Sequence, residues 1–374
     1  MTDVVVVGAG IVGAAVAREL AVRGVGVTLL DRGAVSSGTT GLGEGNVLCS
    51  DKDTGPELAL TRAGLAVYAE LEARMGDVAR IRRKGALIVH PDAETWAGEP
   101  ARLARLGIVD AELIGPEELR ALEPELTGPV HGASRFPGDL QCDPRAIARA
   151  LAGEAAAAGA TVREGCGVAA IEPGSGVRTT SGERIAAGAV VLAAGAWSAP
   201  LAAGAGLALP VEPRKGQLVR LTAPAPGLIR HKVVDGSYLR SVTSAGRGLE
   251  LSTVVETTWE GDVLVGSSRE RRGFDTDVDP AVTEAMVERA ARLFPWLPSL
   301  PRAAAWAGLR PWLPDHLPAI GRSGAVPGLW VATGHEGAGV ALGPVTGVLV
   351  AQLYAGEAPV VDPAPFDPDR FTRS

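Results

Sequence analysis

The sequence predicts an α/β fold in which a Rossmann-like, dinucleotide-binding domain carries an inserted α+β domain built on an antiparallel sheet. Three observations predict it. The chain opens with a strand, a glycine-rich turn, a helix and a second strand that ends in an acidic residue. Segments of strand and helix character recur in two later blocks. A region of period-two alternation, which is typical of antiparallel strands, lies between these blocks.

The opening unit has the glycine spacing of a phosphate-binding turn. Residues 4–7 are consecutive valines, as expected for a strand buried on both faces of a parallel sheet. Gly8 then makes the tight turn, Gly10 allows backbone amides to approach a pyrophosphate, and Gly13 lets the following helix pack closely on the strand. The helix N-terminus, with its unpaired amides and positive dipole end, is expected to face the phosphates.

Asp31 ends the second strand and completes the unit. A carboxylate at this position can accept a hydrogen bond from a ribose 2′-hydroxyl and disfavours a 2′-phosphate, so NADP is the poorest candidate. The unit contains a strand, a helix, a second strand and an acidic residue in the expected order. This order favours a dinucleotide site over a glycine-rich turn with a purely structural role. The opening unit by itself leaves FAD and NAD open.

Composition narrows the class of function. The 374 residues are enough for two domains or one elaborated α/β body. With 36 basic and 43 acidic residues the net charge is −7, and no run of like charges suits a phosphate backbone, so nucleic acid is not an expected partner. Cys49, Cys142 and Cys166 form no CxxC pair, so any iron–sulfur cluster would belong to a partner.

Neither secretion nor membrane insertion is expected. Residues 1–31 are accounted for as a folded unit without a basic leader or cleavage site, so we expect a cytoplasmic protein. Residues 189–210 carry no charge, but this stretch is rich in alanine and glycine and is broken by Pro200. We predict a buried strand over residues 189–195 in place of a membrane span.

Helix and strand signals follow in order along the rest of the chain. A loop rich in glycine and hydroxyl groups is expected at residues 36–46, a helix at 56–74, and a second helix after the N-cap Asp143, running to residue 159. Further strands are expected at residues 84–90, 160–164, 167–172 and 183–192, antiparallel strands at 217–221, 237–241 and 263–265, and an amphipathic helix at 280–294.

The cofactor domain is expected to be discontinuous, because its segments fall in three separate blocks. We place it at residues 1–83, 141–215 and 303–374. The inserted domain, which would carry the substrate, is placed at residues 84–140 and 216–302.

Five segments, spread over nearly the whole chain, resemble those of one enzyme family. They are the opening unit and residues 37–46, 190–198, 306–321 and 328–339. In order and spacing they resemble the D-amino-acid oxidase family of FAD enzymes, which includes glycine oxidase, sarcosine oxidase and D-amino-acid dehydrogenases. Residues 43–48 and 334–337 are most similar to the flavin subunits of opine oxidase, D-hydroxyproline dehydrogenase and hydrogen cyanide synthase.

The resemblance implies FAD as the cofactor. Noncovalent binding is expected, because no cysteine stands near Trp306, where similar sarcosine oxidases attach their flavin. The opening motif and the resemblance together give these expected cofactor-binding residues: Gly8, Gly10, Ile11, Val12, Gly13, Asp31, Arg32, Gly38, Thr39, Thr40, Gly45, Asn46, Val168, Ala194, Gly195, Trp197, Gly308, Arg310, Gly334, His335, Glu336, Gly337, Gly339 and Val340.

The resemblance to glycine oxidase also implies that Arg310 binds the carboxylate of the substrate. A guanidinium holds a carboxylate through two parallel hydrogen bonds, which would fix an amino acid over a flat ring. The alternative for Arg310 is a salt bridge at the surface or between domains.

Four further side chains are candidates for a role at the substrate pocket. His335 and Glu336 invite a general-base role, although oxidation of a neutral, well-positioned amine does not require a base, and packing at the turn is the alternative. Tyr238 and Arg240 are predicted on one face of a strand that the family uses as the roof of its pocket, with an exposed sheet surface as the alternative.

The expected reaction oxidises an amino acid or N-substituted amino acid to its imine by hydride transfer to flavin N5, followed by hydrolysis. The substrate classes that the resemblance implies are D-amino acids, glycine or sarcosine, hydroxyproline and opines. Oxygen, or a second subunit that bears an iron–sulfur cluster or a flavin, would take the electrons. A non-catalytic or electron-relaying flavin subunit and an NAD-dependent dehydrogenase are the alternatives. No metal is expected, because the other four histidines lack metal-ligand spacing.

Overall fold

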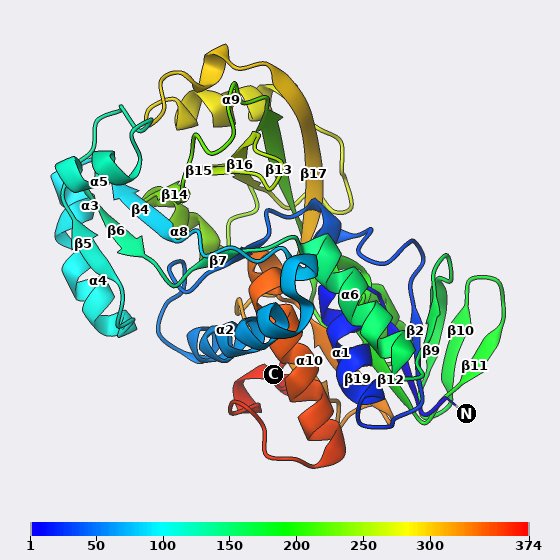
Figure 1. The fold of residues 1–374 in the computed structure, drawn as a ribbon. Helices are drawn as coiled ribbons and strands as arrows, with labels where there is room; N and C mark the ends of the chain where they lie inside the picture. Colours follow the sequence, from blue (N-terminus) through cyan, green and yellow to red (C-terminus); the bar gives the residue numbers. More distant parts are fainter. Residues whose placement is uncertain (1, 373–374) are drawn as a thin grey trace.

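The computed structural model describes residues 2–372, apart from the side chain of Arg240. Two large sheets organise these residues, one of six strands and one of eight (Figure 1). The predicted combination of a parallel sheet with an inserted, largely antiparallel sheet is present.

The six-stranded sheet contains the opening unit. In spatial order its strands are β18 (Ala319–Arg322), β19 (Leu329–Thr333), β12 (Ala189–Leu192), β1 (Val4–Val7), β2 (Val27–Leu30) and β8 (Thr161–Arg163). β18 runs antiparallel to β19, and the other neighbours are parallel. β1, β2, β12 and β19 are buried along their whole length, which explains their nearly continuous apolar sequences.

Four helices pack beside this sheet: α1 (Ile11–Ala21), α2 (Pro56–Met75), α6 (Pro144–Ala157) and α10 (Gly339–Ala355). α1 contacts both α6 and α10, and α10 also contacts α2 (Figure 1). The approach of α1 and α10 depends on glycine, since a Cβ at Gly347 would lie 2.6 Å from the backbone of Ala15 and one at Gly343 would lie 2.9 Å from Ile11. These pairings make the two helices parallel and bring their N-termini to one end of the sheet.

The predicted helix after Asp143 begins as expected. The carboxylate of Asp143 accepts hydrogen bonds from the backbone amides of Arg145 and Ala146, and Pro144 occupies the first helical position. The predicted helix at 56–74 corresponds to α2, and the one at 280–294 corresponds to the shorter α9 (Pro280–Ala290).

The eight-stranded sheet forms the inserted body. In spatial order its strands are β17 (Arg302–Trp312), β13 (Glu212–Leu221), β16 (Val263–Arg269), β15 (Glu250–Thr257), β14 (Lys232–Asp235), β4 (Ala86–His90), β6 (Gly132–Phe136) and β5 (Glu112–Ile114). Its neighbours are antiparallel except for the parallel pair β14 and β4. α9 covers one face and buries Met286 and Val287 against β13, β15 and β16 (Figure 1).

β13 and β17 pair with one another at one edge of this sheet. The predicted boundary between residues 215 and 216 falls inside β13, and the boundary between 302 and 303 falls at the start of β17. The division into domains stays a prediction. We propose boundaries that keep all strands of each large sheet within one domain, so that β13 and β17 both belong to the inserted domain.

The predicted strand at residues 237–241 is wrong, because this segment forms the helix α8 (Ser237–Val242). The carboxylate of Asp235 accepts hydrogen bonds from the backbone amide and the hydroxyl of Ser237, which turns the chain at the end of β14. Five residues of alternating polarity do not distinguish a strand from a short helix. Tyr238 therefore lies on a helix, and the side chain of Arg240 lies outside the described part of the structure.

Shorter elements complete the described residues. β9 (Val168–Glu172), β10 (Gly176–Thr179) and β11 (Arg184–Ala186) form a small antiparallel sheet, so the predicted strand at 183–192 divides into β11 and β12. The others are β3 (Asn46–Val47), β7 (Leu140–Gln141), α3 (Ala93–Ala97), α4 (Glu99–Leu106), α5 (Pro116–Leu122), α7 (Ser198–Gly204) and the 3₁₀ helices η1 (Thr39–Leu42), η2 (Gly76–Ala79), η3 (Gly195–Trp197), η4 (Leu297–Ser299), η5 (Glu336–Ala338), η6 (Ala364–Phe366) and η7 (Pro368–Phe371).

α10 is the most apolar helix near the site. Together with the preceding turn, Glu336–Ala355, it is long and apolar enough to cross a membrane by length and composition alone. In the fold, Leu342, Val345 and Leu349 have no exposed surface, and α10 lies against α1 and α2. Burial in the core therefore accounts for its apolar sequence.

Candidate cofactor and substrate site

A cavity of about 990 Å³ is lined by residues from both large sheets. Its volume is at the upper end of the range for ligand pockets. Most residues predicted for the site line it: Gly8, Gly10, Ile11, Val12, Asp31, Arg32, Gly38, Thr39, Thr40, Gly45, Asn46, Val168, Ala194, Gly195, Trp197, Tyr238, Gly308, Arg310, His335, Glu336, Gly337, Gly339 and Val340. Two predicted residues, Gly13 and Gly334, do not line it.

The glycine turn at one end of the cavity leaves no room for side chains. Gly8 has φ of 105°, and a Cβ there would lie 2.5 Å from the carbonyl oxygen of Ala193. A Cβ at Gly10 would lie 3.0 Å from the hydroxyl of Thr40. Gly13 sits behind the wall, where a Cβ would lie 1.8 Å from the carbonyl oxygen of Gly8. The turn therefore exposes backbone to the cavity, and the helix is pressed against the strand.

The carboxylate of Asp31 accepts hydrogen bonds from the glycine turn and from the segment after β2. One carboxylate oxygen accepts a hydrogen bond from the amide of Ala9 at 2.7 Å, and the other accepts one from Gly33 at 2.8 Å. Each carboxylate oxygen can accept a second hydrogen bond, and Asp31 lines the cavity. It can therefore hold the turn in shape and still receive a ribose hydroxyl.

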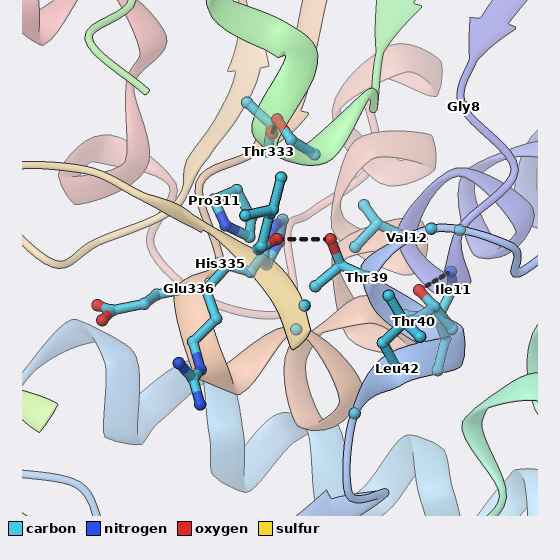
Figure 2. Close-up of a pocket in the computed structure, with 18 of the residues that line it drawn as sticks. Gly8, Ile11, Val12, Thr39, Thr40, Leu42, Pro311, Thr333, His335 and Glu336 are labelled. Atoms are coloured by element: carbon cyan, nitrogen blue, oxygen red, sulfur yellow. Dashed lines mark hydrogen bonds between the residues drawn. The ribbon is translucent and has the colours of Figure 1, made fainter. Parts of the chain in front are cut away.

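The loop that contains η1 ties the two sheets together along the cavity. The hydroxyl of Thr40 accepts a hydrogen bond from the amide of Ile11 at 3.1 Å, and the hydroxyl of Thr39 donates one to the carbonyl oxygen of Leu309 at 2.6 Å (Figure 2). Thr40 thereby caps the N-terminus of α1, while Thr39 fastens the loop to β17. The loop was predicted from its hydroxyl and glycine content, and these bonds explain that content.

An aromatic stack closes another part of the wall. The guanidinium of Arg32 lies 3.8 Å from the ring centre of Trp197, and Trp197 stacks on Phe274 with ring centres 5.7 Å apart. Arg32 and Trp197 were predicted at the cofactor, whereas Phe274 was not. Phe274 belongs to the loop that follows β16, so the stack links the inserted body to the parallel sheet.

These features fit FAD. The side-chain-free turn, the N-terminus of α1 on the cavity wall and a carboxylate at the end of β2 match what a pyrophosphate and a ribose require. The cavity then continues from this turn along η1 to β13, β16 and β17, which gives length for an extended dinucleotide and a substrate. These residues would hold the cofactor, and noncovalent binding stays a prediction.

Arg310 stands on β17, on the cavity wall formed by the eight-stranded sheet. Its guanidinium crosses Gly216 on the paired strand β13, where a Cβ would lie 2.0 Å from Nη1. Nη1 also donates a hydrogen bond to the backbone oxygen of Ser268 at 3.0 Å. Burial and the nearby charge of Arg269 lower the pKa of Arg310 to about 10, so it stays protonated at neutral pH. No Asp or Glu of residues 2–372 forms an ion pair with it.

Glu336 faces the same end of the cavity but already has partners. Arg214, which is 1% exposed, donates a hydrogen bond to its carboxylate, and Nδ1 of His316 lies 3.2 Å from the other oxygen. Burial alone would raise the pKa of Glu336, but these two hydrogen bonds and the charge of Arg214 hold it below its usual value. Glu336 is therefore a charged, paired group at neutral pH and a weak base.

His335 is buried and its ring is held in place. Its Nε2 lies 3.0 Å from the hydroxyl of Thr346 on α10. Burial lowers the pKa of His335 to about 3, so the ring is neutral at neutral pH. Figure 2 shows His335 and Glu336 on the same side of the cavity as Pro311, across from Thr39 and Thr40. Gly334 takes φ of 82° just before this pair and shapes the turn from behind the wall.

Tyr238 lines the cavity from α8, and two cations lie over its ring. Nζ of Lys232 is 5.5 Å from the ring centre, and the guanidinium of Arg269 is 4.9 Å from it. The phenol hydroxyl lies 3.5 Å from the carboxylate of Asp51. Tyr238 therefore orients charged neighbours and is not a solvated sheet residue.

The sequence did not single out the buried charges of this wall. Lys232 forms an ion pair with Glu44 at 2.7 Å, and Lys52 forms one with Asp51 at 3.0 Å. Arg269 was also missed. One signal was available: the chain has four lysines among its 36 basic residues, and Lys52, Lys84, Lys215 and Lys232 are all buried.

Within residues 2–372, no group of three or more His, Cys, Asp or Glu side chains is placed to hold a metal ion.

Comparison with known proteins identifies the family. The DAO family, described as FAD dependent oxidoreductase, matches residues 3–353. Glycine oxidase of Geobacillus kaustophilus is 33% identical over 97% of this chain and 96% of its own, and a crystal structure of glycine oxidase from that organism, 31% identical, covers 98% of both chains with a TM-score of 0.87. Hydrogen cyanide synthase subunit HcnC of Pseudomonas aeruginosa is 34% identical over 68% of this chain and 58% of its own.

A third likeness is to the crystal structure of L-proline dehydrogenase from P. horikoshii, which is 27% identical and covers 100% of this chain and 98% of that chain with a TM-score of 0.89. FAD is the cofactor, as predicted, and the NAD-dependent alternative is wrong. The protein is an enzyme that acts on amino acids. The chain belongs to the DAO family of FAD-dependent oxidoreductases.

Proposed function

We propose that the protein oxidises an amino acid or N-substituted amino acid at the carbon next to nitrogen, with Arg310 holding the carboxylate of the substrate. One observation carries the proposal: a protonated guanidinium lines the cavity and has no carboxylate partner among the described residues. A buried charge without a counter-ion is costly until an anion binds. Arg310 can therefore contribute strongly to the binding of a carboxylate.

The residues around Arg310 are suited to position the substrate and are not suited to transfer a proton. Bound FAD supplies the hydride acceptor, so the substrate leaves as an imine that water hydrolyses. Burial lowers the pKa of His335 to about 3, and the pairing of Glu336 with Arg214 holds its pKa below the usual value, so neither is suited to take a proton from an ammonium group at neutral pH. The amine is expected to react as the free base, held by its carboxylate with its C–H bond facing the cofactor.

The names of the relatives support this class of substrate. Glycine oxidase and L-proline dehydrogenase are both named for amino acids. One is named an oxidase and the other a dehydrogenase, and HcnC is named as a subunit. The electron acceptor, whether oxygen or a second subunit with an iron–sulfur cluster or a flavin, stays a prediction.

Anaerobic bleaching of the bound flavin tests the proposal. The panel contains glycine, sarcosine, D- and L-amino acids, hydroxyproline isomers and opines. At least one compound is expected to bleach the flavin, and Arg310→Ala is expected to lower kcat/KM at least tenfold, because a charge-assisted hydrogen bond is worth about 1.5–3 kcal/mol. Arg302→Ala, at the exposed start of the same strand, is the matched control.

Nearly unchanged constants in Arg310→Ala would contradict the role of this residue. No bleaching by any amine would instead favour the electron-relaying subunit. Reoxidation of the reduced flavin in air-saturated buffer separates the acceptors, since slow reoxidation excludes an oxidase.

A further inference from the structure

We propose that Glu44 accepts a hydrogen bond from the amino group of the substrate while Arg310 holds its carboxylate, so that the substrate is fixed at two points. This inference rests on the proposed function and adds the residue that recognises the amine. Glu44 lies on the loop between η1 and β3, and its side chain, which is 15% exposed, lines the main cavity.

The two oxygens of the Glu44 carboxylate have different surroundings. Oε2 accepts hydrogen bonds from Nζ of Lys232 at 2.7 Å and from Nδ2 of Asn46 at 3.1 Å. The described residues give Oε1 no hydrogen-bond donor. Each oxygen of an ionised carboxylate can accept two hydrogen bonds. Lys232 and Asn46 therefore hold the carboxylate in place and leave one oxygen for an N–H group of a ligand.

The other carboxylates near Arg310 are occupied at both oxygens. One oxygen of Glu336 accepts a hydrogen bond from Arg214, and the other lies 3.2 Å from Nδ1 of His316. One oxygen of Asp51 lies 3.0 Å from Nζ of Lys52, and the other lies 3.5 Å from the hydroxyl of Tyr238. Glu44 is therefore better suited than either of them to accept a hydrogen bond from a ligand.

Glu44 is charged at neutral pH, but its charge is balanced. Burial alone would raise its pKa, whereas the charge and hydrogen bond of Lys232 and the charges of Arg310 and Arg269 hold the pKa below its usual value. Glu44 can therefore accept a hydrogen bond and is a weak base. Because Lys232 offsets its charge, Glu44 can orient a free amine without strongly favouring the ammonium form.

Arg310 and Glu44 stand over the same face of the eight-stranded sheet. A Cβ at Gly216 on β13 would lie 2.0 Å from Nη1 of Arg310, and a Cβ at Gly266 on β16 would lie 3.0 Å from Oε1 of Glu44. The Cβ at Gly266 would also lie 2.8 Å from the side chain of Leu218. Leu218 follows Gly216 by two positions on β13, so the two glycines face the same side.

The spacing between these two positions suits one α-amino acid. β13 and β16 are paired antiparallel strands, and Gly216 and Gly266 are diagonal neighbours, which are about 7–8 Å apart in such a pair. A charge-assisted hydrogen bond is about 2.8 Å long. One such bond at each end leaves a short gap, which the carboxylate and the amine of one α-carbon can bridge.

Two attachment points on one wall also orient the reacting bond. With its carboxylate at Arg310 and its nitrogen at Glu44, the α-carbon directs its C–H bond and side chain away from the sheet and into the cavity. Holding a reactant in this way lowers the barrier by positioning alone. An amine that reacts in this position must carry at least one N–H group as the free base.

The test compares the binding of α-aminoisobutyrate and pivalate to the oxidised holoenzyme, measured as perturbation of the flavin spectrum. The two compounds have the same shape, with a methyl group of pivalate in place of the amine. Neither carries a hydrogen on the α-carbon, so the flavin stays oxidised. The variants are Glu44→Gln, Glu44→Asp and Arg310→Gln. Glu212→Gln is the matched control, because Glu212 lies on β13 and lines neither cavity.

Glu44→Gln is expected to weaken the binding of α-aminoisobutyrate at least tenfold. Its affinity for pivalate should stay the same or increase, because a negative charge near the bound anion is lost. Arg310→Gln should weaken both compounds, and Glu212→Gln should change neither. Glu44→Asp, which keeps the charge but is shorter, should lose part of the affinity for α-aminoisobutyrate alone, and it guards against a folding defect in Glu44→Gln.

An unchanged Kd for α-aminoisobutyrate in Glu44→Gln, or an equal loss for both compounds, would overturn the role of Glu44. If Arg310→Gln binds both compounds like the native enzyme, the carboxylate site of the proposed function fails. The difference between the two compounds in Glu44→Gln still decides the amine site in that case.

Discussion

The two ends of the cavity are built in different ways. At the cofactor end, glycines and backbone amides from the first 33 residues make much of the wall, and Asp31 accepts hydrogen bonds from the amide of Ala9 in the glycine turn and from the amide of Gly33 after β2. At the substrate end, buried charged side chains meet from strands, helices and loops that are distant in sequence. The cofactor end depends on shape and the substrate end on charge. We therefore expect substitutions that add bulk to disrupt the cofactor end, and substitutions that remove a charge to disrupt the substrate end.

The largest effect is expected at the cofactor end. Gly13→Ala places a methyl group 1.8 Å from the carbonyl oxygen of Gly8, which forces α1 away from β1. We expect loss of bound FAD and a fall of at least about 3 kcal/mol in the free energy of unfolding. Flavin content and urea denaturation measure the two effects.

The matched control is Gly153→Ala in the middle of α6. A Cβ there meets nothing within 4 Å, so the change should stabilise the protein by about 0.5–1 kcal/mol. Full FAD binding by Gly13→Ala would show that close packing of α1 on β1 is not required.

Removal of the charge of Arg214, behind the substrate end, is expected to act mainly on stability. Arg214→Met leaves the carboxylate of Glu336 buried with His316 as its remaining partner, and loss of one member of a buried pair costs about 3–5 kcal/mol. The pKa of Glu336 should then rise above its unfolded value, so the loss should grow as pH increases from 5 to 8. Urea denaturation at both pH values measures it.

The double variant Arg214→Met/Glu336→Gln is the control for this pair, because it also removes the uncompensated charge. It should recover part of the stability and show a weaker dependence on pH. A pH-independent loss in Arg214→Met would contradict the ion-pair interpretation.

A smaller effect is expected at Gly216, whose lack of a side chain makes room for the guanidinium of Arg310. Gly216→Ala places a Cβ 2.0 Å from Nη1 of Arg310 and must displace the guanidinium. We expect a tenfold increase in KM for the amino acid with FAD content unchanged. Gly248→Ala, whose Cβ meets nothing within 4 Å, should leave KM as it is. An unaltered KM in Gly216→Ala would mean that Arg310 does not need its present position.

The smallest effect concerns pH dependence. With the pKa of His335 at about 3 and that of Glu336 below its usual value, neither changes charge between pH 5 and 8. The value of kcat/KM should therefore rise with pH as the free substrate amine loses its proton, and His335→Gln should keep this profile. A limb near pH 6 that disappears in His335→Gln would assign a proton transfer to this histidine.

The same contrast explains what the sequence could predict. The cofactor end was predictable because its glycines, Asp31 and the strand and helix between them follow one another closely, as do Asp143 and Pro144 at the start of α6. The resemblance placed Arg310 because its motif is also local.

The substrate end was not predictable in the same way. The meeting of Arg310 with Gly216 depends on the register of β13 against β17, and the pairing of Arg214 with Glu336 joins residues more than a hundred positions apart. The strand predicted around Tyr238 failed because the alternation in that short segment did not reveal the turn at Asp235. Ion pairs between residues that are distant in sequence can be identified only in the folded structure.

Binding of a non-oxidisable carboxylate tests the central claim most directly. Acetate is titrated into the oxidised native enzyme and into Arg310→Gln, and the perturbed flavin spectrum gives Kd. We predict at least a tenfold weaker Kd in Arg310→Gln with an unchanged ratio of FAD to protein, since the cofactor end is built separately. The same Kd in both proteins, or loss of FAD from Arg310→Gln, would contradict the account.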